Sequence, residues 1–109
     1  MANLIAVVDT SFDAQVLKCD IPVLADFWAT WNGPSKAVDP YLKEIAVDYE
    51  GKVKVVKLDI DDNPMVTSNY SVLNIPTLIL FKFGQPVERL TGPLSKETIL
   101  TKIKPYFDE

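Results

Sequence analysis

The side chains best suited to chemistry are concentrated between residues 26 and 36. Asp26 stands inside the apolar run Val23–Trp28, which suits a strand buried on both faces. A carboxylate buried without a partner is costly, so such a group raises its pKa and stays protonated. Asp26 is therefore a candidate for proton transfer, although a structural aspartate bonded to backbone or water gives the same pattern.

Asn32 and Ser35 flank the dipeptide Gly33-Pro34, shortly after that run. From the residues alone, Asn32 is an N-cap for a helix that begins near Pro34, and Ser35 is a locally bonded residue of its first turn. Asp26 and Ser35 form a hydrolytic pair only if a base of fixed geometry and an oxyanion site accompany them. The chain contains no histidine, and a protonated Asp26 is a poor base, so we do not expect serine hydrolysis.

The composition narrows the possible functions. A chain of 109 residues, 48% of them hydrophobic, suits a single domain spanning residues 1–109. A net charge of −4 disfavours nucleic acids and anionic membrane surfaces as partners. With no histidine and with Cys19 as the one cysteine, we expect no metal, no other cofactor and no internal disulfide.

The apolar runs are short compared with the ~20 residues that a transmembrane helix needs. No basic residue precedes the first of them, Leu4–Val8, so the N-terminus does not resemble a secretory signal. We therefore expect a cytoplasmic protein with no membrane partner.

Hydrophobic periodicity predicts alternating strands and helices. Strands are predicted over 4–8, 22–28 and 53–60, followed by an antiparallel hairpin of 77–81 and 87–91 joined through Gly84-Gln85. A helix follows Thr10 or Ser11 as its cap, and another spans 34–49 with a kink at Pro40. Further helices begin after the caps Asn63 and Ser95, and Pro105 ends or bends the last one. The order predicts an α/β domain in which helices flank a mixed sheet.

Four short motifs stand in order along the chain: Asp26-Phe27-Trp28-Ala29, the Trp-x-Gly-Pro-x-Lys of residues 31–36, Ile75-Pro76-Thr77 and Thr91-Gly92. None is conclusive alone. Together, at these separations, they resemble the thioredoxin family over nearly the whole chain. The resemblance implies an α/β, thioredoxin-like three-layer sandwich, with a mixed β-sheet of about five strands flanked by helices.

The resemblance also implies that Asn32 and Ser35 occupy the positions of two reactive cysteines. The family carries Trp-Cys-Gly-Pro-Cys-Lys, with the nucleophile at the position of Asn32 and the resolving cysteine at that of Ser35. A thiolate attacks a disulfide sulfur and forms a mixed disulfide. An amide cannot do so, and a serine hydroxyl titrates far too high. The chain as written is therefore predicted to be inactive in exchange.

Two further positions match the proton-handling residues of the family. The aspartate that matches Asp26 lies beneath the second cysteine and helps to move its proton, and a lysine lies near it. Lys57 alternates with Val53 and Val55 on one face of a neighbouring predicted strand and fits that lysine. An ordinary lysine that extends from a strand end is the alternative.

The family also implies a groove for substrates. Its residues here are Trp31, Gly33, Pro34, Ile75, Pro76 and Gly92. The resemblance implies a cis Ile75–Pro76 bond in a loop that pairs its main chain with an extended segment. Asn74 stands where glycine is frequent and Pro93 follows Gly92, so the substrate preference is left open.

Two functional hypotheses remain. In the first, the chain is a family member whose dithiol form is a general protein-disulfide reductase, here redox-inactive because both cysteines are replaced. Its implied partners are protein disulfide substrates and a thioredoxin reductase, and we expect a monomer. In the second, it is a natural redox-inactive module that binds extended peptides or a protein partner. Cys19, predicted near the end of the first helix, allows an intermolecular disulfide but cannot replace the missing nucleophile.

Overall fold

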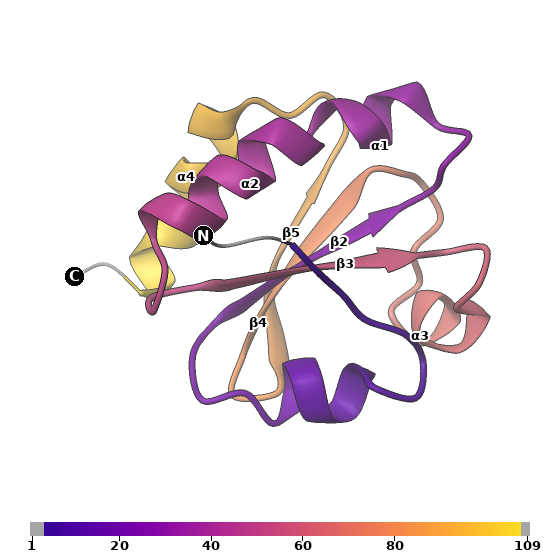
Figure 1. Cartoon of the computed structure of the whole chain (residues 1–109), viewed down its shortest axis with the longest axis horizontal. Coiled ribbons are helices and arrows are strands. Elements are labelled where there is room, and N and C mark those ends of the chain that lie inside the picture. Colours follow the sequence, from indigo (N-terminus) through magenta and orange to yellow (C-terminus); the bar gives the residue numbers. More distant parts are fainter. Residues whose placement is uncertain (1–3, 108–109) are drawn as a thin grey trace.

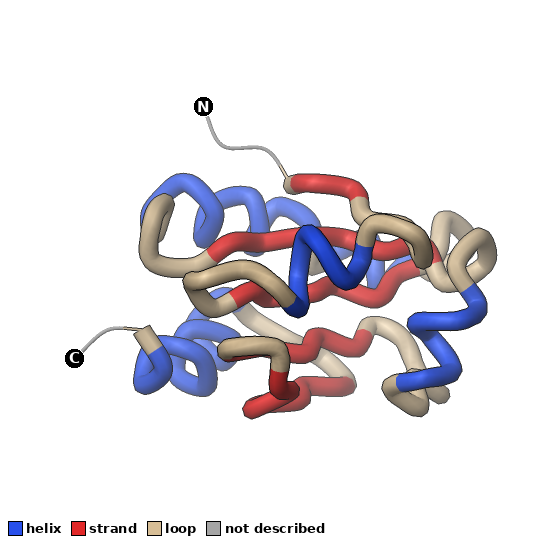
Figure 2. Tube along the Cα trace, turned by 90° about the horizontal axis from the view of Figure 1, so that it is seen from below, coloured by secondary structure: helices blue, strands red, loops and turns tan. Residues whose placement is uncertain are grey.

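The computed structural model describes residues 4–107, which form a five-stranded sheet between helices (Figure 1, Figure 2). The strands are β1 (Ile5–Ala6), β2 (Val23–Trp28), β3 (Lys54–Asp59), β4 (Thr77–Lys82) and β5 (Gln85–Thr91). They lie in the order β1-β3-β2-β4-β5. The first three in this order run parallel, whereas β4 is antiparallel to β2 and β5 is antiparallel to β4. The predicted α/β sandwich with a mixed sheet is confirmed.

Helices cover both faces of this sheet (Figure 1). One face carries the short π-helix η1 (Asp13–Leu17) and α3 (Pro64–Asn69). The other carries α2 (Asp39–Asp48) and α4 (Lys96–Ile103), which continues into the 3₁₀ turn η2 (Lys104–Tyr106). The short helix α1 (Gly33–Ala37) follows β2 and leads into α2. No helix within residues 4–107 has the length and apolar character needed to cross a membrane.

Each face of the sheet buries its own hydrophobic cluster, because successive strand residues point to opposite faces. Val23, Ala25 and Phe27 of β2 pack with the cluster beneath η1 and α3. Leu24 packs with the cluster beneath α2 and α4. By this alternation Asp26, two residues after Leu24, faces the side of the sheet that carries α1 and α2.

The single helix predicted over 34–49 is wrong in one respect, since the structure divides it into α1 and α2 at Val38. Pro40 lies in the first turn of α2. Proline has no N–H, so in a continuous helix the carbonyl four residues earlier, on Lys36, would lose its partner. The chain therefore ends one helix and begins another.

The predicted cap of the first helix is also wrong. The helix begins after Phe12 without a side-chain cap. The Ser11 hydroxyl instead bonds within the turn that precedes the helix, where it accepts from Val8 N at 3.0 Å. The predicted cap at the last helix is confirmed, because Ser95 Oγ accepts from Thr98 N at 3.1 Å.

Asn63 precedes α3 as predicted, but its side chain does not cap that helix. Its Oδ1 accepts from Asp9 N and its Nδ2 donates to Asp59 O, both at 2.9 Å. The cap comes from Asp9, whose carboxylate accepts from Met65 N at 3.2 Å and Val66 N at 2.9 Å. A residue far away in the sequence thus holds the start of α3.

The β4–β5 hairpin closes through the two residues Phe83 and Gly84, both with positive φ (51° and 78°). β5 consequently begins at Gln85, two residues earlier than predicted. Such φ values fit the tight turns that match strand twist. A Cβ on Gly84 would lie 3.0 Å from Leu17 O, so this position favours glycine for space as well as conformation.

Candidate functional site

The turn between β2 and α1 is closed by the two polar side chains that sequence reasoning selected. Asn32 caps α1 as predicted, because its Oδ1 accepts from Ser35 N at 2.7 Å. Ser35 is 1% exposed. Its Oγ accepts from Ala29 N at 3.3 Å and lies 2.9 Å from Asn32 O and 3.1 Å from Ala29 O, to one of which it donates. Both side chains are thus bonded to the backbone of their own turn.

Asp26 is buried as predicted, at 1% exposure. Its Oδ1 has no hydrogen-bond partner among the described residues. Burial raises the pKa of this carboxyl from about 3.8 to about 7, with the nearby Lys57 opposing the rise and Asp39 adding to it. The group therefore changes its charge near neutral pH.

Lys57 lies beside Asp26 on the neighbouring strand β3, at the paired position of the parallel register. Its ammonium group is 3.2 Å from Asp39 Oδ1 and 4.1 Å from the centroid of the Trp28 ring. Asp39 also pairs with Lys43 at 3.1 Å. Burial acts to raise the pKa of Asp39, but hydrogen bonds from Lys43 and Lys57 outweigh it and the pKa is lowered. The carboxylate that holds Lys57 is therefore Asp39, which sequence reasoning missed.

These side chains surround one small polar pocket of about 200 Å³. Its lining residues are Trp28, Ser35, Lys36, Asp39 and Lys57. Asp26 lies two residues before Trp28, on the same face of β2, and interacts electrostatically with Lys57 and Asp39. The structure thus brings together the four predicted positions 26, 32, 35 and 57 around the start of α1.

An apolar groove lies on the other side of α1. The Ile75–Pro76 bond is cis, as the resemblance implied. Four of the six predicted groove residues, Pro34, Ile75, Pro76 and Gly92, line this groove of about 510 Å³. The remaining lining residues are Ala37, Val38, Tyr41, Pro93 and Leu94. We refer to these nine residues as the apolar groove.

Trp31 and Gly33 do not line the apolar groove but lie in the turn that leads to Pro34. Trp31 is 65% exposed, and its Nε1 donates to Asp61 Oδ2 at 2.8 Å. Gly33 is exposed, and a Cβ placed on it would meet nothing within 4 Å.

Sequence reasoning missed five residues of the groove. Val38 and Tyr41 lie within the predicted helix 34–49, and their apolar character was used there only as evidence for a helix. Val38 is buried, but Tyr41 is 36% exposed beside the groove. Pro93 directly follows the Thr91-Gly92 motif, and this apolar neighbour could have indicated that the groove continues beyond Gly92.

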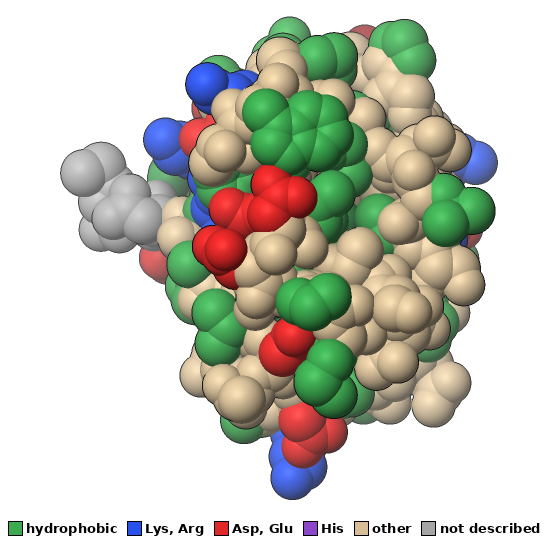
Figure 3. All heavy atoms as spheres, turned by 90° about the vertical axis from the view of Figure 1, so that its right-hand side faces the viewer, with side chains coloured by type: hydrophobic (Ala, Val, Ile, Leu, Met, Phe, Trp, Pro, Cys, Tyr) green, Lys and Arg blue, Asp and Glu red, His purple; other side chains and the backbone are tan. Residues whose placement is uncertain are grey.

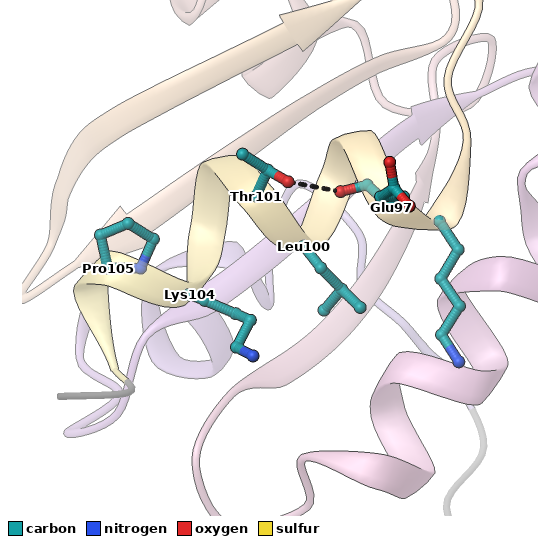
Figure 4. Close-up of a pocket in the computed structure, with 6 residues that line it drawn as sticks. Glu97, Leu100, Thr101, Lys104 and Pro105 are labelled. Carbon is teal, nitrogen blue, oxygen red and sulfur yellow. Dashed lines mark hydrogen bonds between the residues drawn. The ribbon is translucent and has the colours of Figure 1, made fainter.

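A larger hollow of about 710 Å³ lies along α4 (Figure 4). Lys96 at its edge pairs with Glu44 at 2.9 Å and Asp48 at 3.1 Å, and Thr101 Oγ1 donates to Glu97 O at 2.9 Å. None of its six lining residues is buried, and it contains none of the predicted site residues. It is a surface depression remote from the turn at residues 29–35.

Other chemistry is sparse in the described part of the chain. Residues 4–107 contain no cluster of three or more histidine, cysteine, aspartate or glutamate side chains able to hold a metal. Cys19 is partly buried against the cluster beneath η1. It precedes β2, whereas the turn with Asn32 and Ser35 follows β2, so the thiol lies at the opposite end of that strand.

The sequence of this chain also matches a known family and several known proteins. The sequence model of the thioredoxin family matches residues 3–105. The chain is 48% identical over 99 residues to thioredoxin 1 of Nostoc sp., covering 91% of this chain and 92% of that protein. It is 48% identical over 98 residues to the thioredoxin of Synechocystis sp., with 90% and 92% covered. It is 50% identical over 99 residues to the thioredoxin of Mycobacterium tuberculosis, with 91% and 85% covered.

Proposed function

We propose a function from one established premise: this chain belongs to the thioredoxin family. The chain is a thioredoxin whose dithiol form is a general protein-disulfide reductase, and in which Asn32 and Ser35 stand at the two cysteine positions. As written it carries out no thiol–disulfide exchange, because neither side chain can form a mixed disulfide. It keeps the groove and binds extended segments of protein partners without a covalent bond.

The proposal rests on the burial of Asp26 and on the raised pKa of its carboxyl group. A buried carboxyl whose Oδ1 has no hydrogen-bond partner lowers the stability of the fold. A binding groove alone has no need of such a group. An exchange site does, because a buried base of pKa about 7 is suited to take a proton from a thiol at position 35. This favours a redox parent over a natural binding module.

The surroundings of Asp26 support the same assignment. Lys57 and Asp39 form a pair beside it and share one pocket with Ser35. A proton can therefore leave Asp26 toward polar groups rather than into the apolar core. The dithiol form would take protein disulfides and a thioredoxin reductase as partners. We propose that the protein acts in the cytoplasm as a monomer.

Restoring both thiols tests this proposal. The chain as written is expected to add nothing to the rate at which dithiothreitol alone reduces insulin, and Asn32→Cys with Ser35→Cys is expected to accelerate this reduction. Asn32→Cys alone, mixed with insulin in the absence of dithiothreitol, should trap a mixed disulfide, because Ser35 cannot resolve it. All variants should carry Cys19→Ala, which removes the remaining thiol.

Two results would contradict the proposal. One is turnover by the Cys19→Ala chain with Asn32 and Ser35 unchanged. The other is a double cysteine variant with a normal circular dichroism spectrum that neither forms the 32–35 disulfide nor reduces insulin.

A further inference from the structure

The apolar groove contains no charged side chain. All nine of its lining residues are uncharged, and they come from α1, α2 and the loops before β4 and α4. Its volume of about 510 Å³ falls within the ~300–1,000 Å³ of ordinary ligand sites. Such a pocket accepts a large apolar side chain and disfavours a charged one, which would lose its hydration there.

The neighbouring loop after β3 is acidic. Asp59, the last residue of β3, and Asp61 and Asp62 of the loop that follows stand within four residues, and we name these three the acidic loop. Asp59 Oδ1 accepts from Asp61 N at 2.9 Å, and Asp61 Oδ2 accepts from Trp31 Nε1 at 2.8 Å. The second bond joins the acidic loop to the turn that carries Pro34 of the groove. Figure 3 views the molecule from the right-hand side of Figure 1, and on this face acidic side chains lie beside hydrophobic ones.

Positive charge from the protein does not balance the acidic loop. Within the described residues, none of its three carboxylates belongs to an ion pair. Lys57, the nearest strand lysine in the sequence, is held by Asp39. The other segments around the groove, 29–35, 71–76 and 92–95, contain no charged residue, and Lys36, between the groove residues Pro34 and Ala37, is a single positive charge against the three carboxylates. The end of the molecule that carries the groove is therefore negative.

Trp31 provides a second reason for a cationic ligand. The residue is 65% exposed, and the edge of its ring is fixed by Asp61. A lysine or arginine placed over an exposed indole gains a cation–π contact, and here it would also reach a carboxylate. The ring and the carboxylate together favour a basic side chain over an acidic or neutral one.

We propose that the groove selects an extended segment of a partner protein in which a large apolar residue lies close to basic residues. The apolar side chain occupies the apolar groove beside Pro76, and a basic side chain contacts Trp31 and the acidic loop. A second copy of this chain is a poor occupant, because it has a net charge of −4 and would bring a second acidic loop. This inference rests on the non-covalent binding proposed above and adds the chemical class of the partner.

Isothermal titration calorimetry with two matched peptides tests the selection. Both are blocked, cysteine-free heptapeptides with a central phenylalanine. One carries lysine two residues before and two residues after the phenylalanine, and the other carries glutamate there. At 50 mM salt the lysine peptide is expected to bind at least about fivefold more tightly, a ratio that two partly exposed charge contacts can give. The ratio should fall toward one at 500 mM salt, because screening weakens such contacts.

Variants of the protein locate the effect. Asp61→Asn with Asp62→Asn should remove most of the preference, while the new amide oxygen at position 61 can still accept from Trp31. Asp20→Asn is the control for a general charge effect, because it removes one negative charge from an exposed residue that precedes β2 and should leave most of the preference. Replacing the phenylalanine of the lysine peptide by serine should weaken binding about tenfold or more, since a large apolar side chain leaves the groove.

The outcomes separate this inference from the proposed function. Equal binding of the two peptides, or an equal loss of preference in Asp20→Asn, overturns the charge selection and leaves the groove function intact. If neither peptide binds a protein with a normal circular dichroism spectrum, the non-covalent groove function fails, and this inference fails with it.

Discussion

At the scale of single residues, Asp26 couples folding to pH. Its folded pKa of about 7 lies above the unfolded value of about 3.9, so the native state binds the proton more tightly. The stabilising contribution is therefore complete below about pH 4 and is lost as the pH rises through 7. We expect the free energy of unfolding to fall by roughly 2–3 kcal/mol between pH 5 and pH 8 through this residue.

Asp26→Ala should remove that dependence. The variant is expected to be more stable than the parent at pH 8, by roughly 1–3 kcal/mol after the cost of the small cavity is subtracted. The gain should shrink or reverse at pH 5. Urea denaturation followed by circular dichroism at both pH values measures it. A variant that is less stable than the parent by about a kcal/mol at pH 8 would contradict this prediction, because it would mean that the ionised carboxylate is stabilised by hydrogen bonds in the folded state.

Local residue patterns predicted much of the candidate site. The run Val23–Trp28 identified Asp26 as buried, and Asn32 before Gly33-Pro34 identified a cap. The partner of Lys57 was not predictable, because Asp39 lies 18 positions away on another element and no periodic pattern joins the two. The resemblance placed Lys57 near Asp26 but gave no reason for a second carboxylate.

At the scale of elements, α3 depends on a cap from a distant residue. Asp9 accepts from the N–H groups of Met65 and Val66, which have no acceptor within a helix that has only begun. Its negative charge also lies at the positive end of the helix. Asp9→Ala is therefore expected to destabilise the protein by about 1–2 kcal/mol.

Urea denaturation at pH 7 checks this prediction. Asp9→Asn should recover part of the loss, because an amide oxygen still accepts a hydrogen bond. Asp13→Ala is the control: its carboxylate is 63% exposed and pairs only with Lys18 at the surface, so little change is expected. The cap assignment is wrong if Asp9→Ala and Asp13→Ala have equal effects.

Most elements followed from periodicity, whereas their ends did not. Stripes at helical spacing and β-branched runs depend on near neighbours, and they predicted the order of strands and helices correctly. The cap of α3 comes from Asp9, up to 57 positions away in the sequence, and short sequence windows contain no signal for such a tertiary contact. The break at Val38 did have a local signal in Pro40, but that signal predicted a kink in one helix and not the end of one helix and the start of another.

At the scale of the whole molecule, the sheet joins two hydrophobic clusters into one unit. Both faces of β2 and β4 are buried, and neighbouring residues of each strand belong to different clusters. Phe12 belongs to the cluster beneath η1, and Leu42 belongs to the cluster beneath α2 and α4. Loss of either cluster exposes the same strands, so the molecule should unfold as a whole.

Truncation in either cluster tests this cooperativity. Phe12→Ala is expected to cost about 3–5 kcal/mol and Leu42→Ala about 2–5 kcal/mol. Each variant should still show one urea transition, with near-UV and far-UV circular dichroism coinciding. Two separated transitions in either variant would mean that the faces of the sheet unfold independently.

The two tryptophans have an optical consequence, because the chain holds them in contrasting surroundings. Trp28 is partly buried with the Lys57 ammonium over its ring, two residues from Asp26, whereas Trp31 lies in solvent beside Asp61. The fluorescence of Trp28 should therefore change as the buried carboxyl ionises, and that of Trp31 should change as a ligand covers the surface around it. Trp31→Phe would leave a single tryptophan, whose emission follows the protonation of the interior without a chemical label.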